Sequence, residues 1–200
     1  MKGRALIVLL AVFLLTGCVR RPVSFTVDEA GDYTGFETVE EGYTRRAAKL
    51  FGWVVLEDLT VTENVKIWQR FLKRAQAGKA AGVRMAEFFG EEMYLIDVFF
   101  RDGQYRAFFS DGFDMRDEPF PFLLTLAGKT NGQPGYAVVL SGDDGLTYEQ
   151  VMHKFVSSQL EEPDIPAHRV LFRGIGEPTW CGFFFCRFFF SVKRKSGAKR

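Results

Sequence analysis

The run MYLIDVFFRDGQYRAFF, residues 93–109, decides the fold. It consists of two apolar stretches that are separated by Arg101-Asp102-Gly103-Gln104. Asp-Gly between two strand-like segments is a strong signal for a hairpin, because both residues tolerate the positive φ angles of a tight turn. The run therefore predicts two antiparallel strands that are joined at Asp102 and Gly103.

Further segments on both sides of this hairpin also have the composition of strands, which is rich in β-branched and aromatic residues. They are WVVLE (53–57), AGVRMAEFF (81–89), PFPFLLTLAG (119–128), PGYAVVLSG (134–142) and HRVLFRG (168–174). Asn131-Gly132 lies between two of these segments and is a second turn signal. These patterns predict several antiparallel strands.

Two helices are predicted before the hairpin. The first covers residues 38–52, with Glu40 and Glu41 in its first turn and Gly52 at its end. The second begins with Thr62 as N-cap and ends at Gly78. Apolar residues recur on one face of the second helix with a helical period, namely Val65, Trp68, Leu72 and Ala75. Its basic residues, Lys66, Arg70, Lys73 and Arg74, are expected to form a solvated face.

A third helix is predicted over residues 146–159, where Thr147 and Gln150 have the spacing of a capping box. The order of elements predicts an α+β fold in which about three helices pack mainly on one face of an antiparallel sheet. We expect a single domain over residues 34–192, followed by a basic tail at 193–200.

The amino terminus has the order of features found in an export signal. Lys2 and Arg4 precede an apolar stretch that is too short to span a bilayer. Leu15-Thr16-Gly17-Cys18 resembles the lipobox of bacterial lipoproteins. The resemblance implies a signal peptide at residues 1–17 and a lipid on the Cys18 thiol. The residues after Cys18 are polar and lack a clear period, so residues 18–33 are expected to form a tether. The alternative is a buried amino-terminal helix in which Cys18 is incidental.

The charge balance changes once this leader is removed. The remaining chain has 24 basic and 25 acidic residues, and five of the basic ones lie in the last eight positions. Residues 18–192 therefore carry a net charge of −6. A net negative folded part does not match the basic stripe of a nucleic-acid-binding protein, so we expect no nucleic-acid partner.

Several segments together resemble a group of small Firmicutes lipoproteins that carry a domain of unknown function. They are WQRFLKRAQAGKAAGVRMAEFF, DVFFRDGQYRAFFSDGFD, SGDDGLTYEQVMHKFVSSQ and IPAHRVLF, and the resemblance covers residues 33–172 in outline. It implies a surface lipoprotein and supplies no catalytic residues. The end of the chain departs from what the group leads us to expect.

Common catalytic and metal-binding patterns are absent from the sequence. The two histidines, His153 and His168, accompany no G-x-S-x-G motif, so we expect structural histidines rather than a triad. The pair Cys181 and Cys186 lacks nearby histidines and does not form a zinc pattern. The acidic run from Asp111 to Glu118 does not match a calcium loop. We therefore expect neither a metal nor a cofactor.

The stretch WCGFFFCRFFFSV, residues 180–192, allows three interpretations. It is a final buried strand, an interfacial anchor whose basic tail meets anionic groups, or the product of a shifted reading frame. Cys181 and Cys186 would point to opposite faces of one regular strand, so a disulfide between them requires a turn or a bulge.

Taken together, the sequence predicts a lipid-anchored binding domain on the extracytoplasmic face of the cell membrane. Its partner would be a protein, a peptide or a cell-wall component. Loops on a rigid scaffold commonly carry such contacts, which makes Asp102, Gly103, Asp111 and Asp114 the candidate binding residues. The alternative is a hydrolase that acts on envelope polymers through paired carboxylates such as Glu87 and Asp97.

Overall fold

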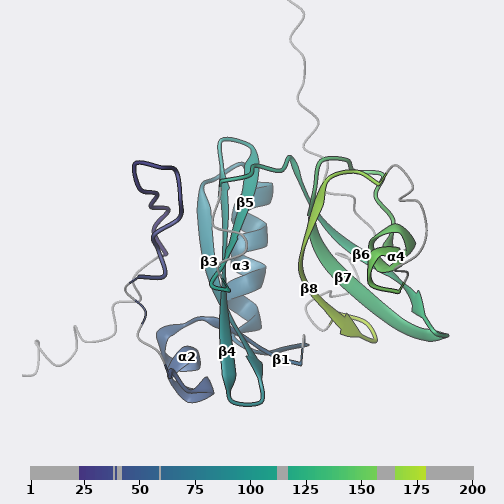
Figure 1. The fold of residues 1–200 in the computed structure, drawn as a ribbon, viewed down its shortest axis with the longest axis horizontal. Coiled ribbons are helices and arrows are strands. Elements are labelled where there is room, and N and C mark those ends of the chain that lie inside the picture. The colour runs from purple at the N-terminus through teal and green to yellow at the C-terminus, as the bar shows by residue number, and fades with distance from the viewer. Residues whose placement is uncertain are drawn as a thin grey trace, which may run out of the picture.

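The computed structural model describes residues 23–37, 39, 42–58, 60–111, 117–156 and 165–178. Eight strands and three helices lie in these ranges (Figure 1). In chain order they are α2 (Arg45–Phe51), β1 (Val54–Glu57), β2 (Thr60–Glu63), α3 (Val65–Gln76), β3 (Ala81–Phe89), β4 (Glu92–Arg101), β5 (Gln104–Phe109), β6 (Phe122–Thr130), β7 (Gln133–Ser141), α4 (Tyr148–Val156) and β8 (His168–Ile175).

The strands form two sheets, one with the order β2-β1-β3-β4-β5 and one with the order β6-β7-β8. Neighbouring strands are antiparallel except β1 and β3, which run parallel and are connected through β2 and α3. The predicted hairpin between β4 and β5 is confirmed, because Phe100 pairs with Tyr105 and both turn residues have positive φ angles. Asn131 and Gly132 form a second turn of this kind between β6 and β7.

The main core lies between the two sheets, and α3 contributes to it (Figure 1). Trp68 and Phe71 of α3 are buried there, and the Trp68 ring contacts the ring of Phe172 on β8. Alternate residues of the strands supply the rest, including Val83, Met85, Ile96, Val98, Leu123, Val138 and Leu140. Because residues on a strand alternate between faces, their sequence neighbours point to the outer sides of the two sheets.

Both outer faces are also covered. Residues 23–37, called the strap below, and α2 lie on the outer face of the five-stranded sheet (Figure 1). Helix α4 covers the outer face of the three-stranded sheet, where Val151 packs near Leu124 and Val139. The described chain therefore has layers in the order strap and α2, five-stranded sheet, α3 with the three-stranded sheet, and α4.

The predicted fold class is wrong. The expected α+β architecture placed about three helices mainly on one face of a single antiparallel sheet, whereas the described chain is mainly β, with two sheets and three short helices on different faces. Local patterns locate a strand and its apolar face, but the division of strands between sheets depends on contacts between distant segments.

Individual elements differ from expectation in informative ways. Thr62 is not an N-cap, because residues 60–63 form β2 and α3 begins after Asn64. The first helix begins after Thr44, whose side chain accepts a hydrogen bond from the amide of Ala47. Glu40 and Glu41 lie outside the described residues. The capping box of α4 is confirmed by the reciprocal hydrogen bonds between Thr147 and Gln150.

The structure also bears on the ends of the chain. Residues 23–33 of the predicted tether belong to the strap, and Tyr33 is buried. The leader with Cys18, and residues 179–200 with both carboxy-terminal cysteines, lie outside the described residues. Within the described ranges, none of the helices has the length and apolar character needed to cross a bilayer.

Candidate binding groove

A buried ion pair lies beneath the strap, on the outer face of the five-stranded sheet. Arg84 of β3 and Asp97 of β4 are direct partners in the strand register. The Nε and Nη2 atoms of Arg84 donate to the two carboxylate oxygens of Asp97 at 2.7 and 2.6 Å. Both side chains are almost entirely buried. A two-point contact of this kind fixes the position of a carboxylate.

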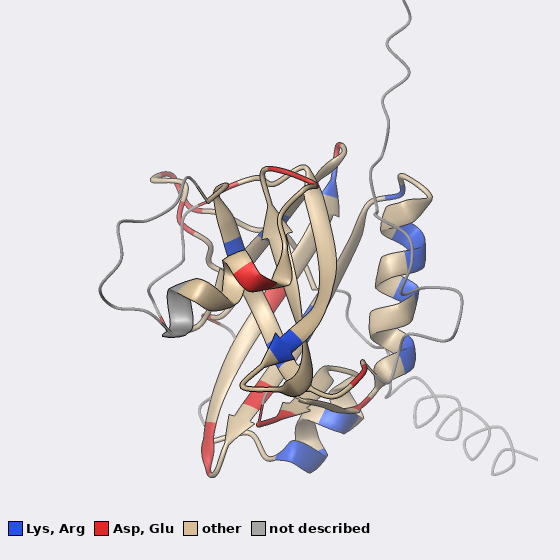
Figure 2. Ribbon diagram, turned by 90° about the vertical axis from the view of Figure 1, so that its right-hand side faces the viewer, with Lys and Arg blue, Asp and Glu red and all other residues tan. Residues whose placement is uncertain are grey.

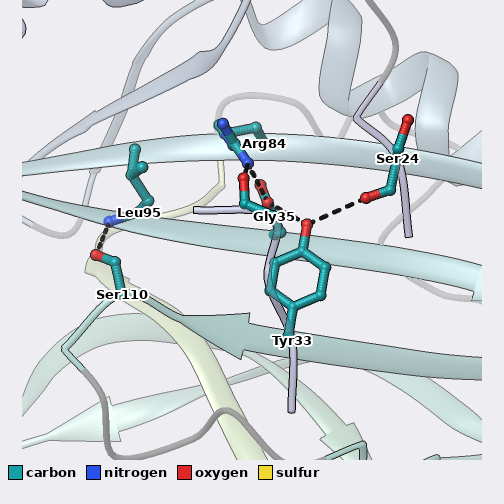
Figure 3. A network of polar contacts seen from close by, with 7 residues as sticks. Ser24, Tyr33, Gly35, Arg84, Leu95 and Ser110 are labelled. Carbon is teal, nitrogen blue, oxygen red and sulfur yellow. Dashed lines mark hydrogen bonds and ion pairs between the residues drawn. The ribbon is translucent and has the colours of Figure 1, made fainter. Parts of the chain in front are cut away.

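The strap covers this pair, and its residues Tyr33 and Gly35 lie beside Arg84 in Figure 3. The Tyr33 hydroxyl donates to Oδ2 of Asp97 at 2.7 Å, and the carbonyl oxygen of Gly35 accepts from Nη2 of Arg84 at 2.8 Å. The guanidinium also lies over the rings of Phe36 and Trp53. These contacts attach the strap to the sheet through polar groups as well as apolar packing.

The titration behaviour of the pair reflects its burial. Loss of water raises the pKa of Asp97, while the contacts with Arg84 and Tyr33 act in the opposite direction. Burial and the nearby carboxylate both raise the pKa of Tyr33 far above its ordinary value. Burial alone lowers the pKa of Arg84, but its hydrogen bonds and charge interaction with Asp97 raise it. Asp97 therefore interacts with both Arg84 and Tyr33, which is consistent with a structural role for the three side chains.

A groove of about 680 Å³ opens beside this network, between the strap, the start of α2 and the β3–β4 turn. Its walls combine apolar and polar residues, as do those of many ligand sites. The apolar lining residues are Phe36, Val39, Tyr43, Phe88, Met93 and Leu95, and the remaining ones are Gly42, Thr44, Arg45, Gly90, Glu91 and Ser110.

The polar groups of the groove already have partners in part. Arg45 donates to the carbonyl oxygen of Gly90 at 2.7 Å and forms an ion pair with Glu57 at 3.0 Å. The Ser110 hydroxyl accepts a hydrogen bond from the Leu95 amide at 2.8 Å. The apolar part of the lining suits the binding of an apolar group.

An exposed aromatic cluster extends from one side of the groove. Tyr43, which lines the groove, contacts the rings of Phe51 and Trp53 edge-on. Phe51 is 50% exposed and the neighbouring Leu50 is 72% exposed. Exposed apolar residues that adjoin a concave apolar surface are typical of an interaction site.

The residues predicted to form a contact surface lie far apart. Asp102 and Gly103 form the turn before β5, and Asp111 follows the other end of that strand. Six extended residues span about 20 Å, so these loops do not form one surface. Asp111 is adjacent to Ser110 of the groove, whereas Asp102 is at the opposite end of the sheet. Asp114 lies outside the described residues.

The carboxylates considered for a hydrolase are not brought together. Asp97 shares the outer face of the sheet with Arg84, but Glu87 lies three positions after Arg84 and points to the opposite face. Glu87 is buried, and its Oε1 atom has no hydrogen-bond partner within the described part of the chain. Burial raises the pKa of Glu87 to about 7, although Arg173 partly opposes the change.

The histidines also lie apart. His153 is on α4, and Nδ1 of His168, on β8, lies 2.9 Å from the carbonyl oxygen of Pro166. The described ranges contain no cluster of three or more acids, histidines or cysteines suited to a metal ion.

The sequence predicts a tether at residues 18–33 and a helix at 38–52, and neither prediction places Phe36 and Val39 against the sheet, so the groove was not predicted. The residues of the groove floor lie in segments that were predicted as strands, namely Phe88, Met93 and Leu95. The return of Phe36 over the sheet has no comparable local signal.

Comparisons with protein-family models, with curated proteins and with solved structures found no match. The resemblance to Firmicutes lipoproteins therefore stays a prediction from the quoted segments.

Proposed function

We propose that this chain is an exported lipoprotein, anchored through Cys18, whose domain binds a peptide segment of an envelope protein in the groove beside α2. The observation that carries the binding role is the groove itself, which joins an apolar floor to an exposed aromatic cluster. The anchor is supported by the order of features in the leader and by Cys18 after small residues.

A peptide segment fits this surface better than a polymer of sugars. The floor offers Phe88, Met93 and Leu95 to apolar side chains, and aromatic residues such as Tyr43 are frequent energetic centres of protein interfaces. Arg45 and Glu91 at the rim supply charges of both signs, which can orient a bound segment.

The binding role is tested by site-specific photo-crosslinking in intact cells. A photoreactive residue replaces Thr44, which is exposed in the groove, or Lys129, which is exposed on the other sheet. We expect a specific protein adduct from position 44 and none from position 129. Met93→Lys places a charge on the groove floor and should abolish the adduct, whereas Met93→Leu should retain it. Equal adducts from both positions, or hydrolysis of wall material by the purified protein, would overturn the role.

The anchor is tested separately by fatty-acid labelling of the full chain in a bacterium that processes lipoproteins. The parent protein should incorporate label and lose its leader, and Cys18→Ser should do neither. An unlabelled parent protein with an intact first methionine would refute the anchor.

A further inference from the structure

We propose that the domain also contacts anionic phospholipid headgroups through a basic end, defined by Arg74, Lys79 and Arg101. This inference rests on the proposed anchor at Cys18 and adds an electrostatic membrane contact to it. Three observations support it: where the described chain begins, how far Cys18 is from that point, and which charges surround it.

The described chain begins at the basic end. Val23 helps to line a small pocket of about 230 Å³, together with the start of β3 and the end of β4. The other lining residues are Phe25, Ala80, Ala81, Gly82, Phe99, Phe100, Arg101 and Arg106. The Val23 carbonyl oxygen is so close to Gly82 that a Cβ atom there would lie 3.2 Å from it. The strap therefore enters the fold beside Gly82 and Arg101.

The anchor lies a short distance from this point. Cys18 precedes Val23 by five positions, and five extended residues span at most about 18 Å. A lipid on Cys18 would thus hold Val23, and the surface around it, near the headgroups. Two of the intervening residues, Arg20 and Arg21, are themselves basic.

The surface around Val23 carries an excess of positive charge. Arg74 donates from Nη2 to the carbonyl oxygen of Ala80 at 2.8 Å, which places its guanidinium beside the pocket. Lys79 directly precedes Ala80 and is exposed, and the Arg101 side chain is 63% exposed. Two acidic residues offset part of this charge. Asp102 forms an ion pair with Arg101, with Oδ2 3.4 Å from Nε, and Asp117 forms one with the pocket residue Arg106 at 2.6 Å, which leaves Arg74 and Lys79 as the excess. Figure 2 shows that basic positions continue along α3 without an acidic one.

Anionic headgroups match this charge and this position. A lysine or arginine near an anionic membrane surface contributes about 1 kcal/mol, which is too little for stable binding by three residues alone. A covalent anchor makes the contact intramolecular, so the same weak attraction can hold the basic end against the bilayer. The contact should weaken as salt screens the charges.

This orientation leaves the groove available to a partner. The groove residues Gly90, Glu91 and Met93 lie at the start of β4, whereas Arg101 ends that strand. Ten extended residues span about 33 Å. With the basic end on the bilayer, the groove would face away from it.

The test uses the full chain with Cys181→Ser and Cys186→Ser, coupled through Cys18 to a maleimide lipid in vesicles. A fluorescent amino acid replaces Gln104, at the basic end, or Glu91, at the groove, and a quencher is carried on lipid headgroups. On vesicles that contain phosphatidylglycerol, the label at 104 should be quenched more than the label at 91. On phosphatidylcholine alone, this difference should disappear.

Charge reversal provides the decisive comparison. The Lys79→Glu/Arg101→Glu protein should show a docked-to-free ratio at least about 30-fold lower, the effect of losing two such contacts. The matched Arg46→Glu/Lys129→Glu protein reverses two exposed charges that lie outside α3 and the basic end, and it should keep the parent ratio. The proposal would be overturned if quenching did not depend on anionic lipid. It would also be overturned if quenching fell equally in the two charge-reversed proteins.

The proposed anchor at Cys18 and the proposed membrane contact of the basic end can be refuted separately. Chemical coupling at Cys18 replaces lipidation by the cell, so an unlabelled Cys18 in cells would refute the natural anchor without changing the vesicle result. Docking that appears only when an anionic wall polymer is added would assign the basic end to that polymer and would also overturn the membrane contact.

Discussion

Glu87→Gln should make the protein more stable above neutral pH and should remove much of the pH dependence of its unfolding. Glu87 is 7% exposed and lies on the face of β3 opposite to Arg84. Its Oε1 atom has no hydrogen-bond partner in the described part of the chain. A buried carboxylate without such a partner is destabilised when it ionises.

The magnitude follows from the pKa of Glu87, which burial raises from 4.5 to about 7. The folded protein therefore binds this proton more tightly than the unfolded chain does. Between the two pKa values the folded state keeps a proton that the unfolded state has lost, so the free energy of unfolding falls as the pH rises. The difference between the two values corresponds to about 3 kcal/mol, which is lost by about pH 7 and is not regained above it.

The assay is urea unfolding of the parent and variant proteins, followed by tryptophan fluorescence at a series of pH values. Glutamine cannot ionise, so the variant should gain up to about 3 kcal/mol over the parent at about pH 8 and little at about pH 4.5. Glu91→Gln changes an exposed residue and should leave the parent profile unchanged. Identical pH profiles for the parent and Glu87→Gln proteins would refute the reasoning, as would a variant that is less stable at about pH 8.

Three further substitutions test the packing. Asp97→Asn leaves the buried Arg84 charge without its counter-charge. In urea titrations the variant should have a free energy of unfolding about 3–5 kcal/mol lower than the parent. A loss below about 1 kcal/mol would contradict a buried ion pair. Thr147→Ala removes the capping box of α4 and should lower stability by about 1 kcal/mol, while Thr147→Ser should restore it. In Gly128→Ala the new Cβ atom would overlap the Tyr148 ring, so the free energy of unfolding should fall by about 1–3 kcal/mol and the melting temperature should fall with it. An unchanged melting temperature would show that α4 does not pack there.

The hairpins could be predicted because their signals are local. Asp102-Gly103 and Asn131-Gly132 adopt the positive φ angles that these residues tolerate, and the flanking strands pair around them. The capping box at Thr147 was also visible, because its two hydrogen bonds join residues three positions apart.

The buried ion pair could have been predicted from the sequence but was not. Arg84 and Asp97 are charged residues in otherwise apolar strands, and pairing those strands about Gly90 brings the two into register. Asp97 was instead considered as a catalytic carboxylate. Asp97 pairs with Arg84 because of the register between β3 and β4. That register can be predicted only when both strands are considered together.

The sequence by itself determined the turns, most of the strands and helices and the apolar face of α3, and it is the sole basis for the predicted leader and its anchor at Cys18. Only the tertiary structure decided that the strands divide between two sheets, that the strap returns over Arg84 and Asp97, and that a groove forms beside α2. The physical reason is the range of the interactions. Turn geometry, capping and periodicity act within a few residues, whereas the sheet faces and the groove arise from side chains that meet across distances such as Tyr33 to Asp97.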